Sequence, residues 1–289
     1  MTGPVARLLP DAERLHLQHG PIDLVIGADG APGAREAAFR AACARFETVL
    51  GELVEELPLL RRPTRVTPRG TVARRMAAAT LPHADRVFIT PMAAVAGAVA
   101  EEILAAAWTG APLDRAYVNN GGDIALHLAP GACFAIAIAG PEGQDFGRIA
   151  LGHADPVRGI ATSGQRGRSL SFGIADGVTV LAETAACADA AATLIANDVD
   201  LPGHPSIRRL RACDVQADSD LGERLVARQA GPLSPTDVRR ALDRGARTAE
   251  AMRRAGQIHS AALFLRGQVT AVGQGNRCLI ATPKERDHA

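Results

Sequence analysis

Val-Asn-Asn-Gly-Gly-Asp-Ile, residues 118–124, is the stretch of sequence from which the fold can be inferred. Paired glycines tolerate positive φ, and Asn-Gly and Gly-Gly steps are common signals of a tight hairpin turn. Short apolar runs flank the turn, at residues 116–118 and 124–128, and each has the length of a strand. The stretch therefore indicates two antiparallel strands joined by a turn.

Strand and helix patterns alternate on both sides of this turn. Alternating or short apolar runs predict strands, and apolar residues spaced three and four apart predict helices with one buried face. The expected strands cover residues 22–26, 116–118, 124–128, 133–139, 150–151, 169–174, 178–182, 261–265 and 269–272. The expected helices cover residues 34–57, 91–108, 184–197, with Thr184 as N-cap, and 235–255. This order predicts an α+β fold, with antiparallel sheet packed by helices.

The helix expected over residues 91–108 is almost wholly apolar. Its longest apolar run, residues 91–100, stops at Glu101 and Glu102, and is too short to span a bilayer. Small residues such as Gly97 would let the helix pack very closely against a sheet or a ligand. A buried core helix is the alternative interpretation.

Residues 61–81 show no convincing period and are rich in arginine, proline and glycine. We expect a long surface loop there, of the kind that often borders a site. Contact of its arginines with phosphate is the less favoured interpretation.

The composition is that of an ordinary globular protein. Of 289 residues, 47% are hydrophobic and 22% are charged, and the 32 basic and 31 acidic residues nearly cancel. No field of the whole molecule would attract nucleic acid or an anionic membrane, so we expect neither as a partner. Residues 1–19 lack the apolar core of a signal peptide, which favours a cytoplasmic location. A homo-oligomer remains possible on this evidence.

A single domain is favoured because the chain contains no low-complexity linker and no internal repeat. We expect an N-terminal extension over residues 1–20, the domain over residues 21–274 and a C-terminal tail over residues 275–289. The five cysteines are widely spaced without a C-x-x-C pair, so they are expected to be reduced.

Two turn-like segments could bind an anion. In the first, the amides of Gly121 and Gly122 can approach a ligand closely and Asp123 offers a carboxylate, although a plain turn is the commoner meaning of such a pattern. In the second, residues 159–166, two hydroxyls precede a glycine and an arginine follows it. That set is complementary to a phosphate, but the same residues also form simple Ser/Gly turns.

Asp189 and Thr193 lie four residues apart on a predicted helix, and therefore share one face. A carboxylate with a hydroxyl is a partial shell for a hard cation such as Mg²⁺. The alanines around them leave room for something to approach. The alternative is a solvated or locally hydrogen-bonded pair.

Three short motifs follow one another in a recognisable order: Gly121-Gly122-Asp123, Thr162-Ser163-Gly164, and Ala188-Asp189 with Thr193. With them the chain resembles the ApbE-like superfamily, whose best-known members are FAD:protein FMN transferases. Residues 91–101, 169–176 and 219–222 are similar to an uncharacterised branch of that superfamily, and this likeness extends from about residue 23 to residue 272. The resemblance implies a single ApbE-like domain.

The resemblance also implies roles for individual residues. Asp189 and Thr193 would hold Mg²⁺ against the pyrophosphate of FAD, and Asp123 would orient or deprotonate the ligand. A flavin, FAD or FMN, would lie over the first two motifs. The expected ligand contacts are Gly97, Asn120, Gly121, Gly122, Thr162, Ser163, Gly164, Arg166 and Asp176.

Two departures from the transferases bear on the reaction. Ala96 precedes Gly97 where they have a lysine, and residues 171–177 lack the histidine of their corresponding segment. We therefore do not expect FMN transfer to a target protein. Two hypotheses follow: a Mg²⁺-dependent enzyme that acts on a flavin nucleotide or another phosphorylated metabolite, or a non-catalytic carrier, sensor or assembly protein with the same cleft.

Overall fold

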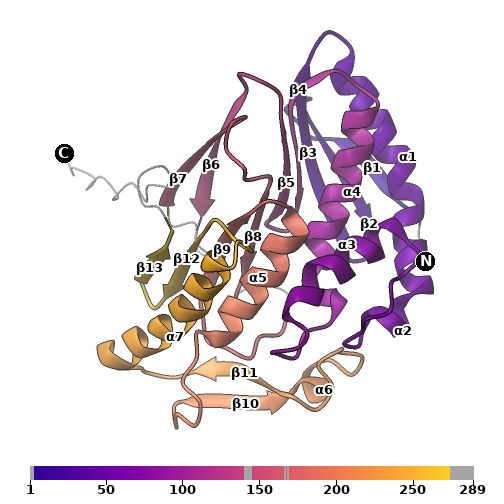
Figure 1. Cartoon of the computed structure of the whole chain (residues 1–289). Coiled ribbons are helices and arrows are strands. Elements are labelled where there is room, and N and C mark those ends of the chain that lie inside the picture. The colour runs from indigo at the N-terminus through magenta and orange to yellow at the C-terminus, as the bar shows by residue number, and fades with distance from the viewer. Residues whose placement is uncertain (1–2, 140–144, 166, 168, 274–289) are drawn as a thin grey trace, which may run out of the picture.

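A nine-stranded antiparallel sheet forms the centre of the molecule (Figure 1). The computed structural model describes residues 3–139, 145–165, 167 and 169–273. Along the sheet the order is β1-β2-β3-β4-β5-β8-β9-β12-β13. Its strands are β1 Val5–Leu8, β2 Arg14–His19, β3 Ile22–Gly30, β4 Leu113–Asn120, β5 Asp123–Leu128, β8 Gly159–Ser163, β9 Gly177–Ala182, β12 Ser260–Leu265 and β13 Gln268–Val272.

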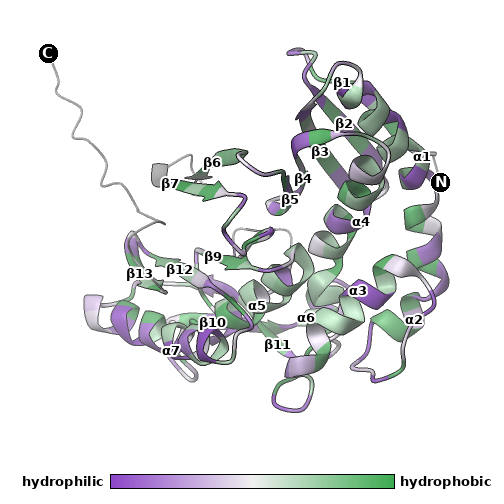
Figure 2. Ribbon diagram, turned by 45° about the horizontal axis from the view of Figure 1, so that its top comes forward, coloured by the Kyte–Doolittle hydropathy of each residue, from purple (hydrophilic) through white to green (hydrophobic). Residues whose placement is uncertain are grey.

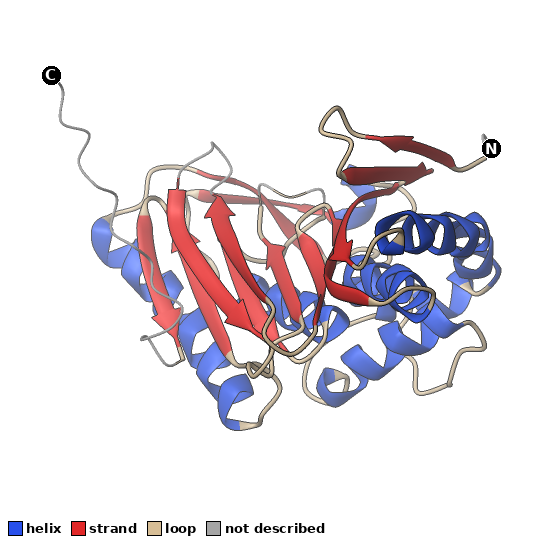
Figure 3. Cartoon of the chain, turned by 90° about the horizontal axis from the view of Figure 1, so that it is seen from above, coloured by secondary structure: helices blue, strands red, loops and turns tan. Residues whose placement is uncertain are grey.

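The long helices gather along one face of this sheet (Figure 3). The α-helices are α1 Ala34–Glu55, α2 Leu57–Leu60, α3 Thr71–Thr80, α4 Val95–Thr109, α5 Ala185–Asp198, α6 Ala212–Val215 and α7 Pro235–Arg254, and the 3₁₀ helices are η1 Leu81–His83 and η2 Pro91–Ala94. Helix α4 packs against β4 and β5, and α5 against β8 and β9. The main core lies between these two layers and is closed by α1 and α7.

A hairpin of β6, Cys133–Ala139, and β7, Asp145–Gly152, covers part of the opposite face. Its Ile149 and Leu151 join a second apolar cluster with Leu126 of β5 and Ile160 of β8. The residues next to Leu126 and Ile160 in β5 and β8 belong to the main core. Successive side chains of a strand point to opposite faces of the sheet, so the two cores lie on opposite sides. The central strands are therefore covered on both faces.

A two-stranded sheet of β10, Ile207–Arg211, and β11, Leu225–Ala230, forms a separate layer with α6 near the ends of the helices (Figure 1). It is attached to the rest by hydrogen bonds, among them one from the N–H of Ala227 to the carbonyl of Ser171. Asp218 pairs with Arg61, and Asp220 accepts a hydrogen bond from Thr90 just before η2.

The α+β prediction, with antiparallel sheet and packed helices, is confirmed. The N-terminal residues differ from the expected extension, because β1 pairs with β2 and β2 pairs with β3, which lengthens the main sheet. Leu15 and Leu17 are buried while their neighbours in β2 are not, so an alternating pattern was present in the sequence. Most of the expected tail lies outside the described residues.

Three local predictions are wrong. Residues 71–80 form helix α3 rather than a loop, because Val72, Met76 and Ala79 place one apolar face against the core. Residues 159–163 form strand β8, and residues 169–174 form no strand. Three arginines of the expected loop form ion pairs: Arg61 with Asp218, Arg65 with Asp85 and Arg75 with Glu101.

The segment Pro91–Thr109 is long and apolar enough to cross a membrane by length and composition alone, with a mean hydropathy of 1.3. In the fold it lies between α1, α5 and the sheet, and its residues from Ala98 to Ala100 are fully buried. Figure 2 shows α4 and α5 as mostly green and white, whereas purple, hydrophilic residues line much of α7. The place of the segment in the core accounts for its composition.

Candidate functional site

Asp189 of α5 caps the first turn of α4. Its Oδ2 accepts a hydrogen bond from the N–H of Gly97 at 3.0 Å, and the N–H of Ala96 also favours the carboxylate. The first N–H groups of a helix have no partner within the helix and attract negative charge. Asp189 is only 9% exposed, so the solvated pair considered from the sequence is wrong for this residue.

Helix α4 caps α5 in return. The Oε1 atom of Glu101 accepts a hydrogen bond from the N–H of Ala186 at 2.7 Å. Thr184 is the N-cap, as predicted, and its Oγ1 accepts from the N–H of Cys187 at 3.2 Å. Each helix thus supplies a carboxylate to the N-terminus of the other.

Glycines make this mutual capping possible. A Cβ on Gly97 would lie 2.3 Å from the carbonyl oxygen of Ala185, and one on Gly159 would lie 2.1 Å from the carbonyl carbon of Thr184. No side chain fits at such distances, so the backbones of α4 and β8 touch the start of α5. The room that the small residues leave is filled by protein, which corrects the expectation that a ligand lies on the helix at Gly97.

The turn between β4 and β5 joins the start of α4. The Nδ2 of Asn120 donates to the carbonyl of Ala96 at 3.1 Å, and the Oδ1 of Asn119 accepts from the N–H of Gly122 at 2.8 Å. Gly121 and Gly122 have φ values of 65° and 113°. A Cβ on Gly122 would meet nothing within 4 Å, so this side of the turn is open to an approaching molecule.

Asp123 follows the turn as the first residue of β5. Its Oδ1 accepts a hydrogen bond from the N–H of Thr162 on the paired strand β8, at 3.2 Å. The hydroxyl of Thr162 lies 3.0 Å from that of Thr179 on β9. The first two motifs of the sequence therefore meet side by side, and Thr162 and Ser163 end a strand rather than form a loop.

The carboxylates of Asp123 and Asp189 interact electrostatically. Burial raises the pKa of Asp189 well above its usual value, and the negative charge of Asp123 raises it further, whereas the N–H groups of Gly97 and Ala96 oppose the shift. A carboxylate that is buried and repelled in this way either keeps its proton or gains from a cation.

The donors present suit a hard divalent cation. Thr193 is half-buried one turn along α5 from Asp189, so a hydroxyl and two carboxylates lie in this region. Among the described residues no group of three or more His, Cys, Asp or Glu side chains could hold a metal ion. Mg²⁺ typically takes one or two carboxylates and completes its shell with water and ligand phosphates, which this set allows.

Other predicted residues lie at the back of the site. Gly164 has a φ of 155°, and a Cβ there would lie 2.8 Å from the carbonyl oxygen of Asp176. The Oδ2 of Asp176 accepts from the N–H of Arg266 at 2.5 Å, so this carboxylate helps to fix the turn between β12 and β13. Arg166 lies outside the described residues.

Two polar features were missed from the sequence. The Nε2 of Gln165 is buried and, in the part of the chain that the structure describes, has no hydrogen-bond partner. Glu101 was visible only as the end of an apolar run. Its carboxylate meets the N-terminus of a helix that begins about 85 residues later in the chain. No local pattern in the sequence predicts such a contact.

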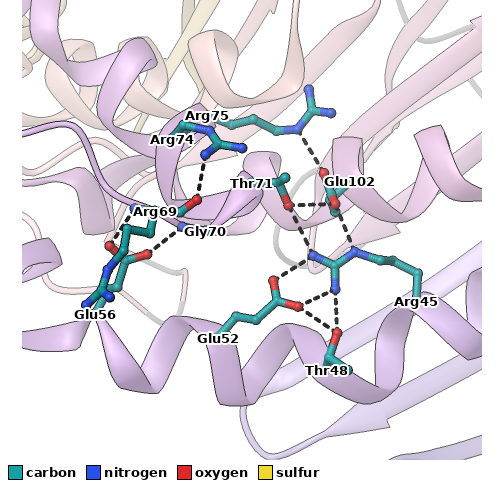
Figure 4. A network of polar contacts seen from close by, with 10 residues as sticks. All are labelled: Arg45, Thr48, Glu52, Glu56, Arg69, Gly70, Thr71, Arg74, Arg75 and Glu102. Carbon is teal, nitrogen blue, oxygen red and sulfur yellow. Dashed lines mark hydrogen bonds and ion pairs between the residues drawn. The ribbon is translucent and has the colours of Figure 1, made fainter.

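An ion-pair network holds the helices behind the site (Figure 4). Glu102 of α4 binds the Nε of Arg45 at 2.9 Å and the hydroxyl of Thr71 at 2.7 Å, and Arg45 also binds Glu52 at 2.7 Å. Burial would raise the pKa of Glu102, but the hydrogen bonds from Thr71 and Arg45 outweigh it and hold that pKa below its usual value. The network joins α1, α3 and α4 into one support.

Residues 6–271 match the family described as AbpE bacteria. Curated relatives are UPF0280 proteins: that of Methanopyrus kandleri is 40% identical over 127 residues, and that of Methanosarcina acetivorans is 35% identical over 131 residues. These alignments cover 44% and 45% of this chain and 48% and 49% of the relatives. The chain spans about half the length of the curated relatives it matches.

Solved structures of flavin transferases are similar at low identity. The apo form of Pseudomonas stutzeri flavinyl transferase ApbE is 12% identical, with a TM-score of 0.49 and coverage of 94% of this chain and 95% of that chain. Vibrio cholerae flavin transferase ApbE is 13% identical, with a TM-score of 0.40 and coverage of 93% and 97%.

Proposed function

This chain belongs to the AbpE bacteria family, within the ApbE-like superfamily, and on that premise we propose that it binds a flavin nucleotide or another phosphorylated small molecule. The observation that carries the proposal is the meeting of two carboxylates, Asp123 and Asp189, from parts of the chain 66 residues apart. Repulsion of the buried Asp189 by the half-buried Asp123 costs free energy, and such costs gather at functional sites. The ligand would bind where β5, β8 and the starts of α4 and α5 meet.

The turn and the end of β8 would contact the ligand. Gly121 and Thr162 are exposed, and the open side of Gly122 allows close approach of a ring or a phosphate. Ser163 continues the same edge. The Nε2 of Gln165, which has no hydrogen-bond partner among the described residues, is a donor able to recognise a ligand acceptor. Backbone amides and hydroxyls of this kind suit phosphate oxygens.

Asp189 and Thr193, with Asp123 nearby, would hold Mg²⁺. When bound, Mg²⁺ supplies positive charge that polarises a phosphoryl oxygen. Asp123 itself accepts a hydrogen bond from the N–H of Thr162, which holds its carboxylate at the end of β8. There it would orient or deprotonate a ligand group. Asp189 is fixed by α4, so it would hold position rather than exchange protons with the ligand.

A non-catalytic role on the same site is the second candidate, and Ala96 favours it. The carbonyl of Ala96 is held by Asn120, and its methyl group brings no charge where the transferases have a lysine. Such a protein would act as a carrier, sensor or assembly factor. We propose a cytoplasmic location for either role, supported by the nearly balanced charge, without a membrane or nucleic-acid partner.

Binding is tested with FAD, FMN and Mg²⁺. Native mass spectrometry of freshly purified protein should show a retained flavin or nucleotide, and flavin fluorescence titrations should give tighter FAD binding with Mg²⁺ than with EDTA. Asp189→Asn and Thr193→Val should remove the Mg²⁺ effect, because each deletes an oxygen ligand. Asp214→Asn, on the surface at α6, is the matched control. Equal Mg²⁺ dependence in all four proteins would contradict the metal assignment.

Turnover separates the two candidate roles. Incubation with FAD and Mg²⁺ followed by chromatography detects release of AMP, and mass analysis of a Ser/Thr acceptor peptide detects attached FMN. We expect no FMN on the peptide. Release of AMP that Asp123→Asn abolishes would establish the enzyme, whereas retained, unchanged FAD would establish the binding protein.

A further inference from the structure

A cavity of about 550 Å³ lies at the far end of α5, away from the candidate site. One wall is the loop after α5, from Leu201 to Pro205, and the other is α7. Asp189 and Asp198 are nine residues apart on α5, which corresponds to roughly 14 Å along the helix, and the cavity begins beyond that. Its volume is within the range of small-molecule sites, about 300–1,000 Å³.

Three arginines of α7 line this cavity. Arg240, Arg244 and Arg247 are spaced four and three residues apart, so their side chains leave the same face of the helix. The opposite face of α7 is buried against α5 and β12 through residues such as Leu242 and Ala249. The packing of α7 therefore fixes the arginine face toward the loop.

Arg244 carries an unused donor inside the protein. Its Nε is buried and, within the described residues, has no hydrogen-bond partner. A buried charged donor without an acceptor is costly, and guanidinium groups pair in two-pronged fashion with phosphate or carboxylate oxygens. Arg244 also lines the cavity, where an anion can pair with its guanidinium group.

The acids nearby do not cancel the positive charge. Among the described residues, Asp243 is the one carboxylate that lines the cavity, against three guanidinium groups. Asp237, one turn earlier, lies 3.6 Å from Arg240 and 3.5 Å from the Nε2 of His204. The Nδ1 of His204 accepts from the N–H of Ser206 at 3.2 Å, which leaves Nε2 as the donor toward Asp237.

From this geometry we infer that the cavity between residues 201–205 and α7 is a second binding site, for a small molecule that carries a phosphate or diphosphate group. Arg244 and Arg247 bind the phosphoryl oxygens, and Arg240 contributes from the exposed rim. The loop Leu201–Pro205, turned at Gly203 with a φ of 76°, forms the apolar side that receives the rest of the molecule. The inference does not depend on the proposed function, because no residue is shared between the two sites.

Calorimetric titration of the full chain with pyrophosphate and with inorganic phosphate, in EDTA and at constant ionic strength, tests this site. Wild-type protein should bind pyrophosphate at one site, and Arg244→Met and Arg247→Met should each weaken it by about tenfold or more. Arg239→Met, exposed on another face of α7, is the matched control and should bind as wild type. Arg247 is itself exposed, so its variant keeps the test valid if Arg244→Met does not fold.

Several outcomes would overturn the inference. Wild-type affinity in both Arg244→Met and Arg247→Met would do so, as would the absence of any binding. Loss of binding in Asp189→Asn with retention in Arg244→Met would place pyrophosphate at the candidate site instead. Binding of duplex DNA that Arg239→Met weakens as much as Arg244→Met would indicate a diffuse basic face rather than a small-molecule site.

Discussion

Asp189 has a structural role at the start of α4 and a chemical role in the candidate site. The sequence predicted that it lies on a helix with Thr193, and the family resemblance implied that the two bind a cation. The structure adds that Asp189 closes the N-terminus of α4 through Gly97. The same carboxylate is thus both a helix cap and the buried member of an acidic pair. Its removal should affect stability as well as ligand binding.

Two substitutions separate these effects. Asp189→Ala leaves the buried N–H of Gly97 without an acceptor, so we expect the free energy of unfolding to fall by about 1–3 kcal/mol. Asp189→Asn keeps an acceptor oxygen and removes the repulsion by Asp123, so it should stay within about 1 kcal/mol of wild type. Urea unfolding without divalent cations measures both.

The exposed Asp214 provides the reference for that comparison. Asp214→Ala should change stability by less than about 0.5 kcal/mol. Equal stability of Asp189→Ala and wild type would show that the cap contributes nothing, and the convergence of α4 and α5 would then rest on packing alone.

At the scale of elements, the contact between α4 and α5 is a backbone contact. Gly97→Ala must displace the carbonyl of Ala185, which a Cβ would approach to 2.3 Å, so we expect a loss of at least about 1–3 kcal/mol. Thermal and urea unfolding report the loss. A bulkier residue such as Val should leave little folded protein.

Gly51, on the exposed side of α1, is the matched control. A Cβ there would meet nothing within 4 Å, so Gly51→Ala should stabilise the protein by up to about 1 kcal/mol through helix propensity. If Gly97→Ala were as stable as Gly51→Ala, the two helices would have to move apart without cost, contrary to the packing described.

Elements with a strong local signal could be predicted from the sequence. The hairpin at Gly121, the N-cap Thr184 and the terminal hairpin at residues 260–272 were found, because turn chemistry and period are local properties. Helix α3 was hidden by the prolines and arginines that precede it. Strand β8 was missed because glycine is typical of turns and Gly159 begins this strand. In the structure Gly159 is needed because a side chain there would clash with the backbone of Thr184.

The candidate site could be predicted only as separate motifs. Order along the chain and resemblance related Asp123, Thr162 and Asp189, but nothing local shows that Asp123 accepts from Thr162 or that Asp189 is buried. Sheet pairing between β5 and β8 and the packing of α5 create those contacts. The cavity beside α7 was missed because half of its wall is an unremarkable loop.

At the scale of the whole molecule, His83 makes stability depend on pH. Burial lowers the pKa of His83 below its usual value, and the charge of Arg86 lowers it further. In the unfolded chain His83 therefore binds a proton near pH 6.5, whereas in the folded chain it binds one only at lower pH. The contribution of His83 to the free energy of unfolding is complete above about pH 6.5. It is lost as the pH falls from about 6.5 to the lower pKa of the folded state.

Urea unfolding between pH 7.5 and pH 5 measures this slope, which one histidine limits to about 1.4 kcal/mol per pH unit. His83→Gln should reduce the slope of the free energy of unfolding against pH. His259→Gln, at an exposed position, is the control. An identical slope in His83→Gln and wild type would assign the acid sensitivity to other groups, such as the partly buried His127, whose pKa burial also lowers.

Mutual capping of α4 and α5 also bears on how the chain is made. The bond from Gly97 to Asp189 spans 92 residues, and that from Ala186 to Glu101 spans 85. At roughly 5–20 residues per second, a ribosome needs about 5–20 s to synthesise the part of the chain between them. For that interval the long apolar segment Pro91–Thr109 has left the ribosome without the partner that closes the first turn of α4. Chaperone demand during synthesis should therefore concentrate on Pro91–Thr109 until α5 emerges.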